Sequence, residues 1–218
     1  MPANADVFQF MSIEILAGPG VLIPRAETEL LGRTALKLLS EGGLNPLVID
    51  MCCGSGNLGL AIADARADAR VLLSDLTDET TRQARTNAER LRLDDRVTIG
   101  QGDMFAGIAA ALAGARADLI VCNPPYISTA KLAGESAHLL EKEPREAFDA
   151  GAYGIAIHQR LIAEAPQYLR QGGWLAFEFG AGQDRQVALL LRRSGAYGPL
   201  SFALNEDDVP RVAYAQLL

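Results

Sequence analysis

Short apolar runs alternate with amphipathic stretches along most of this chain, and the alternation predicts a parallel β-sheet with crossover helices. Five nearly all-apolar runs predict buried strands at 46–52, 71–75, 97–100, 117–122 and 174–179. Between them, apolar residues recur every three or four positions, which predicts helices over 57–66, 78–91, 155–169 and 183–194, with a short Ala-rich helix before residue 117.

The last two strand-like runs, 200–204 and 211–216, are separated by the acidic loop 205–208, a spacing that suits an antiparallel hairpin. Five parallel strands followed by an antiparallel pair predict an α/β fold, a doubly wound, Rossmann-like sheet of seven strands. The fourth strand must end abruptly, because the two prolines that follow it cannot continue a central strand.

The N-terminal part predicts a hairpin or an extended lead-in over 7–23, with strands at 7–10 and 21–23, and then a helix over 24–39. No segment is repetitive, linker-like or of low complexity. We therefore expect one domain over 1–218, with a lead-in hairpin and helix over 1–40 and a catalytic core over 41–218.

Composition excludes several classes of protein. No apolar run approaches the roughly 18 residues that span a bilayer, and the first residues lack the pattern of a signal peptide, so a cytoplasmic location without membrane contact is expected. The net charge of -7 argues against a broad nucleic-acid-binding surface. Three cysteines and two distant histidines form neither a disulfide framework nor a metal-ligand pattern.

A glycine-rich loop lies directly between the first predicted strand of the sheet and the helix after it. Its sequence is Gly54-Ser55-Gly56-Asn57-Leu58-Gly59, and its glycines let the backbone turn tightly and approach a ligand. Asp75, followed by Leu76, lies 21 residues beyond Gly54, where a ribose-binding carboxylate belongs. These features fit a nicotinamide cofactor and a methyl donor equally well.

Two further acids favour the methyl donor. Asp50, four residues before Gly54, would lie close to the diphosphate of NAD and repel it, whereas S-adenosylmethionine has no phosphate and carries two cationic groups. After the third strand, Asp103 is placed to accept from the adenine amine and Met104 to cover the ring. Acids at three successive strand ends would line one crevice at the carboxyl edge of the sheet. We expect an S-adenosylmethionine site there.

The sequence Asn123-Pro124-Pro125-Tyr126 follows the fourth strand, next to the expected methyl group. An amide or aromatic amine nitrogen is a poor nucleophile because its lone pair is delocalised. The Asn123 side-chain oxygen and the Pro124 carbonyl can accept its N–H protons, the prolines fix this geometry, and Tyr126 offers a flat stacking face. These four residues are the candidate catalytic loop, and Asn123 also faces the donor.

At this point the chain resembles the glutamine N5-methyltransferases that modify peptide-chain release factors, which have the class I methyltransferase fold. The similarity runs from Gly18 to the C-terminus, and it is most specific where the lead-in Ile23-Pro24-Arg25-x-Glu27-Thr28-Glu29 is combined with Asn-Pro-Pro-Tyr-Ile. The resemblance implies that the loop 123–126 binds the substrate glutamine amide. It also implies that the donor is bound by Cys52, Cys53, Gly54, Ser55, Gly56, Asp75, Met104 and Asn123.

The chain departs from this family pattern in three places. Ala26 replaces a proline usual in the lead-in, and Cys52-Cys53 stand where Gly-Thr is common. Only about twenty residues precede the similarity, so the helical N-terminal domain that helps bacterial members to dock the release factor is not expected. Eukaryotic and archaeal relatives also lack that domain and work with a small partner subunit, so a partner subunit is possible here.

Several functions remain open from the residues alone. The leading hypothesis is methylation of a glutamine in a protein, and a small-molecule amide or amine is the main alternative acceptor. Adenine N6-methyltransferases use a similar loop, but the acidic charge and the lack of a target-recognition domain argue against that reaction. A nicotinamide oxidoreductase and a donor-binding scaffold are the remaining readings. The oligomeric state is left open.

Overall fold

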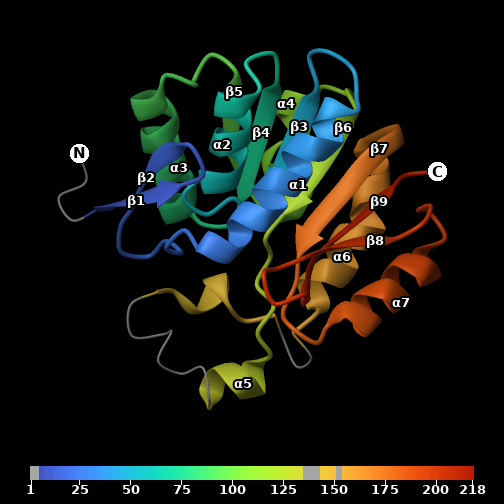
Figure 1. Ribbon diagram of the computed structural model, residues 1–218. Helices are drawn as coiled ribbons and strands as arrows, with labels where there is room; N and C mark the ends of the chain where they lie inside the picture. Colours follow the sequence, from blue (N-terminus) through green and yellow to red (C-terminus); the bar gives the residue numbers. More distant parts are fainter. Residues whose placement is uncertain (1–4, 135–142, 151–153) are drawn as a thin grey trace.

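A computed structural model of the chain describes residues 5–134, 143–150 and 154–218. At its centre is a seven-stranded sheet with the order β5-β4-β3-β6-β7-β9-β8 (Figure 1). The strands are β3 (Leu47–Met51), β4 (Arg70–Asp75), β5 (Val97–Gln101), β6 (Ala117–Cys122), β7 (Leu169–Glu178), β8 (Ser201–Leu204) and β9 (Pro210–Gln216). Strands β3 to β7 are parallel, and β9 runs antiparallel to β7 and β8. The predicted fold class is confirmed.

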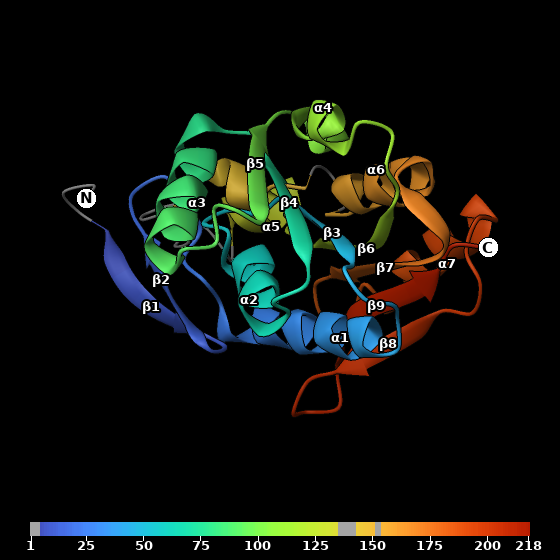
Figure 2. The ribbon, with the colours of Figure 1, turned by 90° about the horizontal axis from the view of Figure 1, so that it is seen from above.

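Helices cover both faces of the sheet, as Figure 2 shows from above. On one face lie α1 (Glu29–Ser40), α2 (Asn57–Ala65) and α3 (Asp78–Leu91); on the other lie α4 (Ala109–Leu112), α6 (Ala156–Glu164) and α7 (Asp184–Ser194). The chain builds the sheet outward from β3 through β4 to β5, and then returns to the other side of β3 with β6. The strand order therefore reverses between β3 and β6, and a ligand crevice is expected beyond their carboxyl ends.

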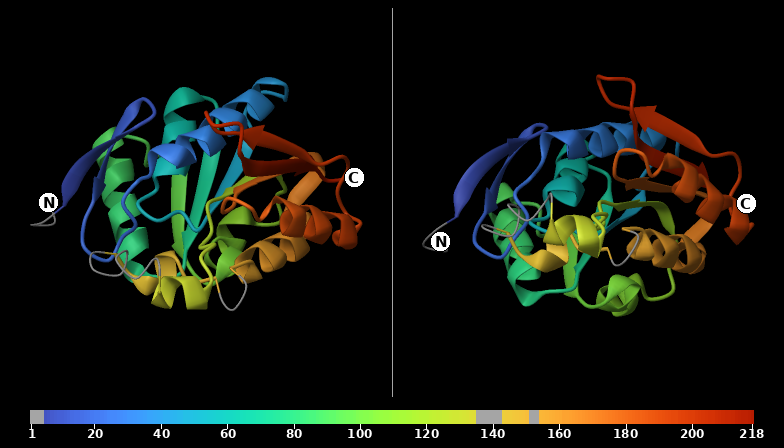
Figure 3. Two further views of the ribbon diagram at one scale, coloured as in Figure 1. Left: turned by 60° about the horizontal axis from the view of Figure 1, so that its bottom comes forward. Right: turned by 90° about the horizontal axis from the view of Figure 1, so that it is seen from below.

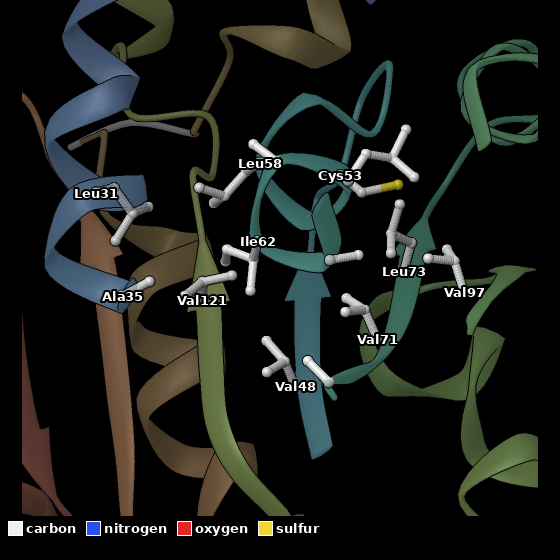
Figure 4. Close-up of a cluster of buried hydrophobic side chains, with 14 of the residues drawn as sticks. Leu31, Ala35, Val48, Cys53, Leu58, Ile62, Val71, Leu73, Val97 and Val121 are labelled. Atoms are coloured by element: carbon white, nitrogen blue, oxygen red, sulfur yellow. The ribbon is translucent and has the colours of Figure 1, made fainter. Parts of the chain in front are cut away.

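Two apolar clusters hold these layers together. Valines of three neighbouring strands, Val48, Val71 and Val121, face the first layer, where Ile62 of α2 and Leu31 of α1 pack against them (Figure 4). The opposite face of the same strands packs against the second layer of helices. Strands buried on both faces are nearly continuous apolar runs, which is why the sequence predicted them well.

The N-terminal hairpin is a separate two-stranded sheet of β1 (Asp6–Phe10) and β2 (Ile13–Ala17). The prediction of a second strand at 21–23 was wrong. Met11, with φ +49°, lets the chain reverse at once, and Ile13 and Ile15 then reach the core beside α3. Val21 instead follows a turn closed by its own N–H to Gly18 O at 3.3 Å.

Two predicted helix boundaries also need correction. The helix predicted over 24–39 begins as a 3-10 turn, η1 (Ala26–Thr28), and becomes α-helical only at Glu29. The helix predicted over 155–169 ends at Glu164, and a 3-10 turn containing Pro166 follows, since proline lacks the N–H that an α-helix interior needs. Strand β7 therefore begins at Leu169 and includes the glycine pair 172–173 that was expected to precede it.

Within the described residues, no helix combines the length and the apolar character that crossing a membrane requires.

The packing of α2 on the sheet generates a stability prediction. Replacing Ile62, which is fully buried, with Ala leaves a cavity between α2 and the strands, and we expect a loss of about 2–5 kcal/mol in the free energy of unfolding. Ile62→Val should lose only about 0.5–1.5 kcal/mol. Urea unfolding followed by circular dichroism measures both. Leu189→Ala on α7, where Leu189 is 42% exposed, is the control and should change little; equal losses for the two alanine variants would contradict this packing.

Candidate active site

A cavity of about 250 Å³ opens at the carboxyl ends of the central strands. In Figure 3, the segment that follows β6 lies across this edge of the sheet. The floor and walls of the cavity come from the loops after β3, β4, β5 and β6, and the roof comes from 20–22 and from 144–149. Of the residues predicted for the donor and the catalytic loop, those in its wall are Cys52, Gly54, Asp75, Leu76, Asp103, Met104, Asn123 and Pro125. We call it the donor cavity.

The two glycines of the loop after β3 have different roles. Gly54 has φ +55°, and a Cβ added there would meet nothing within 4 Å, so its backbone is bare toward the cavity. Gly56 has φ +82°, and its added Cβ would approach side chains of Leu60, Leu73 and Ala84 at 3.0–3.2 Å. One glycine thus lets a ligand approach the backbone, and the other lets α2 begin close to the sheet.

Asp75, at the end of β4, ties this loop to the neighbouring strand. Its Oδ2 accepts the Gly54 N–H at 2.8 Å, and its Oδ1 accepts the Thr80 hydroxyl at 2.8 Å. The carboxylate lies in the cavity wall, as expected of a ribose-binding acid, and Leu76 beside it is 56% exposed. Fixed in this way, the carboxylate can meet a ligand without first being ordered.

Asp50 is not in the wall of the donor cavity. It is 1% exposed, lies under the glycine loop, and accepts the Gly59 N–H at 2.8 Å. Burial, with a smaller contribution from the nearby Asp75, raises the pKa of Asp50 to about 8, against the lowering effect of that hydrogen bond. A protonated Asp50 does not repel a diphosphate by its charge. It anchors the start of α2 and lines a small cavity with Cys52 and Gly54, and its place in the donor site stays a prediction.

Asp103 and Met104 follow β5 and lie in the cavity wall. The Asp103 carboxylate is held by two bonds from Arg160, at 2.9 and 3.1 Å, a pairing that nothing in the sequence indicates. Met104, 6% exposed, has φ +50°, and its carbonyl accepts the Ser74 hydroxyl at 2.8 Å. The expected contacts with an adenine ring remain a prediction, with Arg160 as an added positioning group.

The remaining loop residues are mostly structural. Cys53 is packed in the core, and Ser55 is fully buried with its carbonyl accepting from Asn87 at 2.9 Å. Burial raises the pKa of the Cys53 and Cys122 thiols, which keeps them protonated. The cysteines are free, and nowhere in the described ranges do three or more His, Cys, Asp or Glu residues gather as metal ligands.

A second cavity, of about 360 Å³, adjoins the first, and Asn123 lines both. We call it the acceptor cavity. Pro125 faces the donor cavity, whereas Pro124 and Tyr126 face the acceptor cavity. The other walls of the acceptor cavity come from distant parts of the chain, and they include Arg25, Glu27, Ile127, Phe148, Glu178 and Arg211. The loop after β6 thus forms the partition between two spaces.

Tyr126 is held on several sides. Its hydroxyl donates to Glu178 Oε1 at 3.1 Å, and Arg211 lies 6.0 Å from the ring centroid. Burial raises the pKa of Tyr126, and the Glu178 carboxylate adds to this, so the hydroxyl stays protonated. The Tyr126 carbonyl accepts from Gln183 Nε2 at 3.0 Å. The ring and the backbone of the loop are both fixed before any substrate arrives.

The roof of the donor cavity depends on a residue that the sequence reasoning did not assign. Glu143, 9% exposed, accepts the Ile23 N–H at 2.7 Å and pairs with Arg25. It thereby joins the lead-in to the segment that returns after α5 (Thr129–Ala133). Glu143, Thr28, Glu178, Gln183 and Arg211 were all within the family resemblance, which was the available signal for them, but only the fold brings them together.

Known proteins agree with this fold. The family described as Methyltransferase small domain matches residues 28–152. Among solved structures, a methyltransferase from Pyrococcus furiosus has a TM-score of 0.65 at 16% identity, covering 94% of this chain and 89% of its own, a likeness of fold alone. The fold, the glycine loop and the family match define a Rossmann-like methyltransferase domain.

More specific relatives share one name. A release factor glutamine methyltransferase from Moorella thermoacetica is 39% identical, covering 94% of this chain and 68% of that protein. One from Geobacter sulfurreducens is 36% identical, covering 86% of this chain and 63% of that protein. A release factor-specific protein-(glutamine-N5) methyltransferase from Alicyclobacillus acidocaldarius has a solved structure with a TM-score of 0.56 at 25% identity. The match covers 92% of this chain and 98% of that chain. The chain belongs to the release factor glutamine methyltransferase family, and it spans about two thirds of the length of these curated relatives.

The burial of Asp50 generates a pH prediction. Asn at this position keeps the shape and an oxygen for the Gly59 N–H but does not titrate. Since the folded-state pKa is about 8 and the ordinary value is 3.8, the folded protein keeps a proton that the unfolded chain releases between these values. The free energy of unfolding of the wild type should therefore fall relative to Asp50→Asn as the pH rises, by at most about 1.4 kcal/mol per pH unit.

Urea unfolding of both proteins between about pH 5 and about pH 8 measures this difference. Because all other titrating groups are common to the two proteins, the gap reports Asp50 alone. If the free energy of unfolding of the wild type does not fall relative to that of Asp50→Asn as the pH rises, Asp50 is ionised in the fold.

Proposed function

We propose that this chain transfers a methyl group from S-adenosylmethionine to the side-chain amide nitrogen of a glutamine in a protein, with a release factor as the first candidate. The observation that carries the proposal is that the donor and acceptor cavities meet at Asn123. An amide nitrogen held by Asn123 would then lie next to a donor on the other side of the partition. The names of the relatives support the release factor as the acceptor.

The donor cavity fits S-adenosylmethionine in its chemistry. Gly54 offers a bare backbone, Asp75 a fixed carboxylate for ribose hydroxyls, and Met104 an apolar side chain for a ring. When bound, the donor supplies an electrophilic methyl carbon on a cationic sulfur. No phosphate-binding cation is needed for it, and among the described residues that line this cavity none is Lys or Arg. The family of the chain supports the methyl donor over a nicotinamide dinucleotide.

The residues around the acceptor act by positioning. Asn123 Oδ1 and the Pro124 carbonyl would accept the two N–H groups of the amide and so direct the nitrogen lone pair toward the methyl carbon. Developing positive charge on the nitrogen is favoured by these oxygen dipoles. The consecutive prolines restrict the backbone, which keeps both acceptors in place. No strong base is required at this step, because the N–H proton becomes acidic once the nitrogen is methylated.

A small-molecule amide or amine remains the second candidate acceptor. Two arginines and two glutamates line the acceptor cavity: Arg25, Arg211, Glu27 and Glu178. Because both signs of charge are present, this lining favours neither a cationic nor an anionic acceptor. A neutral amide on a larger molecule fits this balance. A small partner subunit, suggested by the family resemblance, could add to the acceptor side.

Donor binding can be measured by calorimetry. We expect the protein to bind S-adenosylmethionine and not NADH, and Asp75→Ala to weaken donor binding at least about tenfold, because one fixed carboxylate interaction is worth about 1.4 kcal/mol or more. Asp184→Ala, at the partly exposed start of α7 and outside both cavities, is the matched control and should bind normally. Binding of NADH in place of the donor would refute the proposed chemistry.

Methyl transfer can be measured with donor carrying a labelled methyl group, a purified release factor, and separately a small-molecule extract. We expect label in the release factor, on a glutamine located by mass spectrometry. Asn123→Ala should lower kcat by about 10²–10³-fold, as expected for removing a preorganised polar group. Label in the extract alone would favour the small-molecule alternative, and full activity of Asn123→Ala would refute the role of the loop.

A further inference from the structure

Asn123 can hold an acceptor amide only if the correct end of its own side chain faces it. The oxygen and the nitrogen of a carboxamide have nearly the same shape, but one accepts hydrogen bonds and the other donates them. An acceptor nitrogen brings N–H groups, so it needs the Asn123 oxygen. If the Asn123 carboxamide were rotated by about 180°, its NH₂ group would face the N–H groups of the acceptor, and the acceptor amide would not bind.

One neighbour contacts the nitrogen end of this side chain. Asn123 Nδ2 donates to the Thr28 hydroxyl oxygen at 2.9 Å. Thr28 is 2% exposed, so water does not compete for this bond. Within the part of the chain that the structure describes, Asn123 Oδ1 has no hydrogen-bond partner, and the side chain lines both cavities. The nitrogen is thereby occupied, and the oxygen is left for the substrate.

The simplest alternative role for Thr28 is to cap a helix. Thr28 directly precedes α1, but it belongs to the 3-10 turn η1 and its backbone is already helical, with φ -68° and ψ -17°. A capping residue has an extended backbone, as Thr77 has at the start of α3, where it accepts from the Thr80 N–H. The Thr28 side chain makes no cap bond, and its hydroxyl oxygen bonds to a residue 95 positions away.

A buried carboxyl group lies close to Thr28. Glu178 is 2% exposed and accepts from Tyr126. Burial raises the pKa of Glu178, while the Thr28 hydroxyl and the charge of Arg211, 3.7 Å away, lower it. Its Oε2 has no hydrogen-bond partner among the described residues.

A hydroxyl oxygen can accept one hydrogen bond while its proton points elsewhere, so the Thr28 oxygen can accept from Asn123 Nδ2 as the 2.9 Å contact requires.

We propose that Thr28 is a positioning residue for methyl transfer: its hydroxyl oxygen accepts from Asn123 Nδ2 and so holds the Asn123 amide with Oδ1 toward the acceptor. The inference rests on the proposed function. It assigns a role to the threonine of the Glu-Thr-Glu lead-in, which lies outside the catalytic loop.

The test compares Thr28→Val, which removes the hydroxyl and keeps the shape, with Thr28→Ser, which keeps the hydroxyl. Thr28→Val should lower kcat for release factor methylation about 10- to 100-fold and leave the Kd for S-adenosylmethionine within about twofold. Thr28→Ser should keep kcat within about threefold of the wild type. Thr34→Val is the matched control: Thr34 is also buried in α1, but its hydroxyl bonds only to Leu30 O in the same helix, at 2.8 Å.

A second measurement does not depend on activity. The side-chain NH₂ of Asn123, assigned by comparison with Asn123→Ala in a ¹⁵N-edited spectrum, should shift and exchange faster with water in Thr28→Val but not in Thr28→Ser. Unchanged kcat and an unchanged signal in Thr28→Val, or equal damage in the valine and serine variants, would overturn the inference. A wild type that methylates no release factor would count against the proposed function alone, and the spectrum would still decide the role of Thr28.

Discussion

Two aspartate side chains that hold one loop are the interaction on which the donor side depends. Asp50 in β3 accepts the Gly59 N–H, and Asp75 at the end of β4 accepts the Gly54 N–H. Backbone N–H groups in the first turn of a helix have no partner within the helix, so side chains must satisfy them or leave them to water. Asp50 satisfies one of these groups in α2, Asp75 fixes the loop that leads into α2, and two adjacent strands thus make this loop a rigid part of the sheet edge.

The same principle operates on the acceptor side with different groups. The chain after β6 cannot form strand or helix at its two prolines, so its shape is set by side chains that reach it from elsewhere. Thr28 holds Asn123, Gln183 holds the Tyr126 carbonyl, and Glu178 holds the Tyr126 hydroxyl. Each of these contacts joins residues more than fifty positions apart, so the loop is ordered only when the whole sheet has formed.

The fold could be predicted from the sequence because strands buried on both faces are nearly continuous runs of apolar residues. Boundaries were less predictable where one residue overrides a pattern, as Pro166 does at the end of α6 and Met11 does in the hairpin turn. The position of Asp50 could have been inferred. Side chains alternate along a strand, so Asp50 shares the face of Val48, which packs in the cluster beneath α2.

Other features of the site left no trace in the sequence. The bond from Arg160 to Asp103 depends on how α6 lies against the loop after β5, and no local pattern records that. The predicted donor and loop residues were mostly placed at one edge because the carboxyl ends of parallel strands must meet there. The residues that hydrogen-bond to them were not predicted, because those hydrogen bonds are tertiary contacts between distant parts of the sequence.

The partition at Asn123 has a consequence for how this protein can change over evolution. The loops after the first strands of the sheet provide the walls of the donor cavity, whereas the acceptor cavity borrows Arg25 from the lead-in and Arg211 from the last strand. Arg211 does not line the donor cavity, so substitutions in the last strand can reshape the acceptor cavity without changing the walls of the donor cavity. One conserved chemistry can in this way be redirected to new acceptors by changes at the margins of the domain.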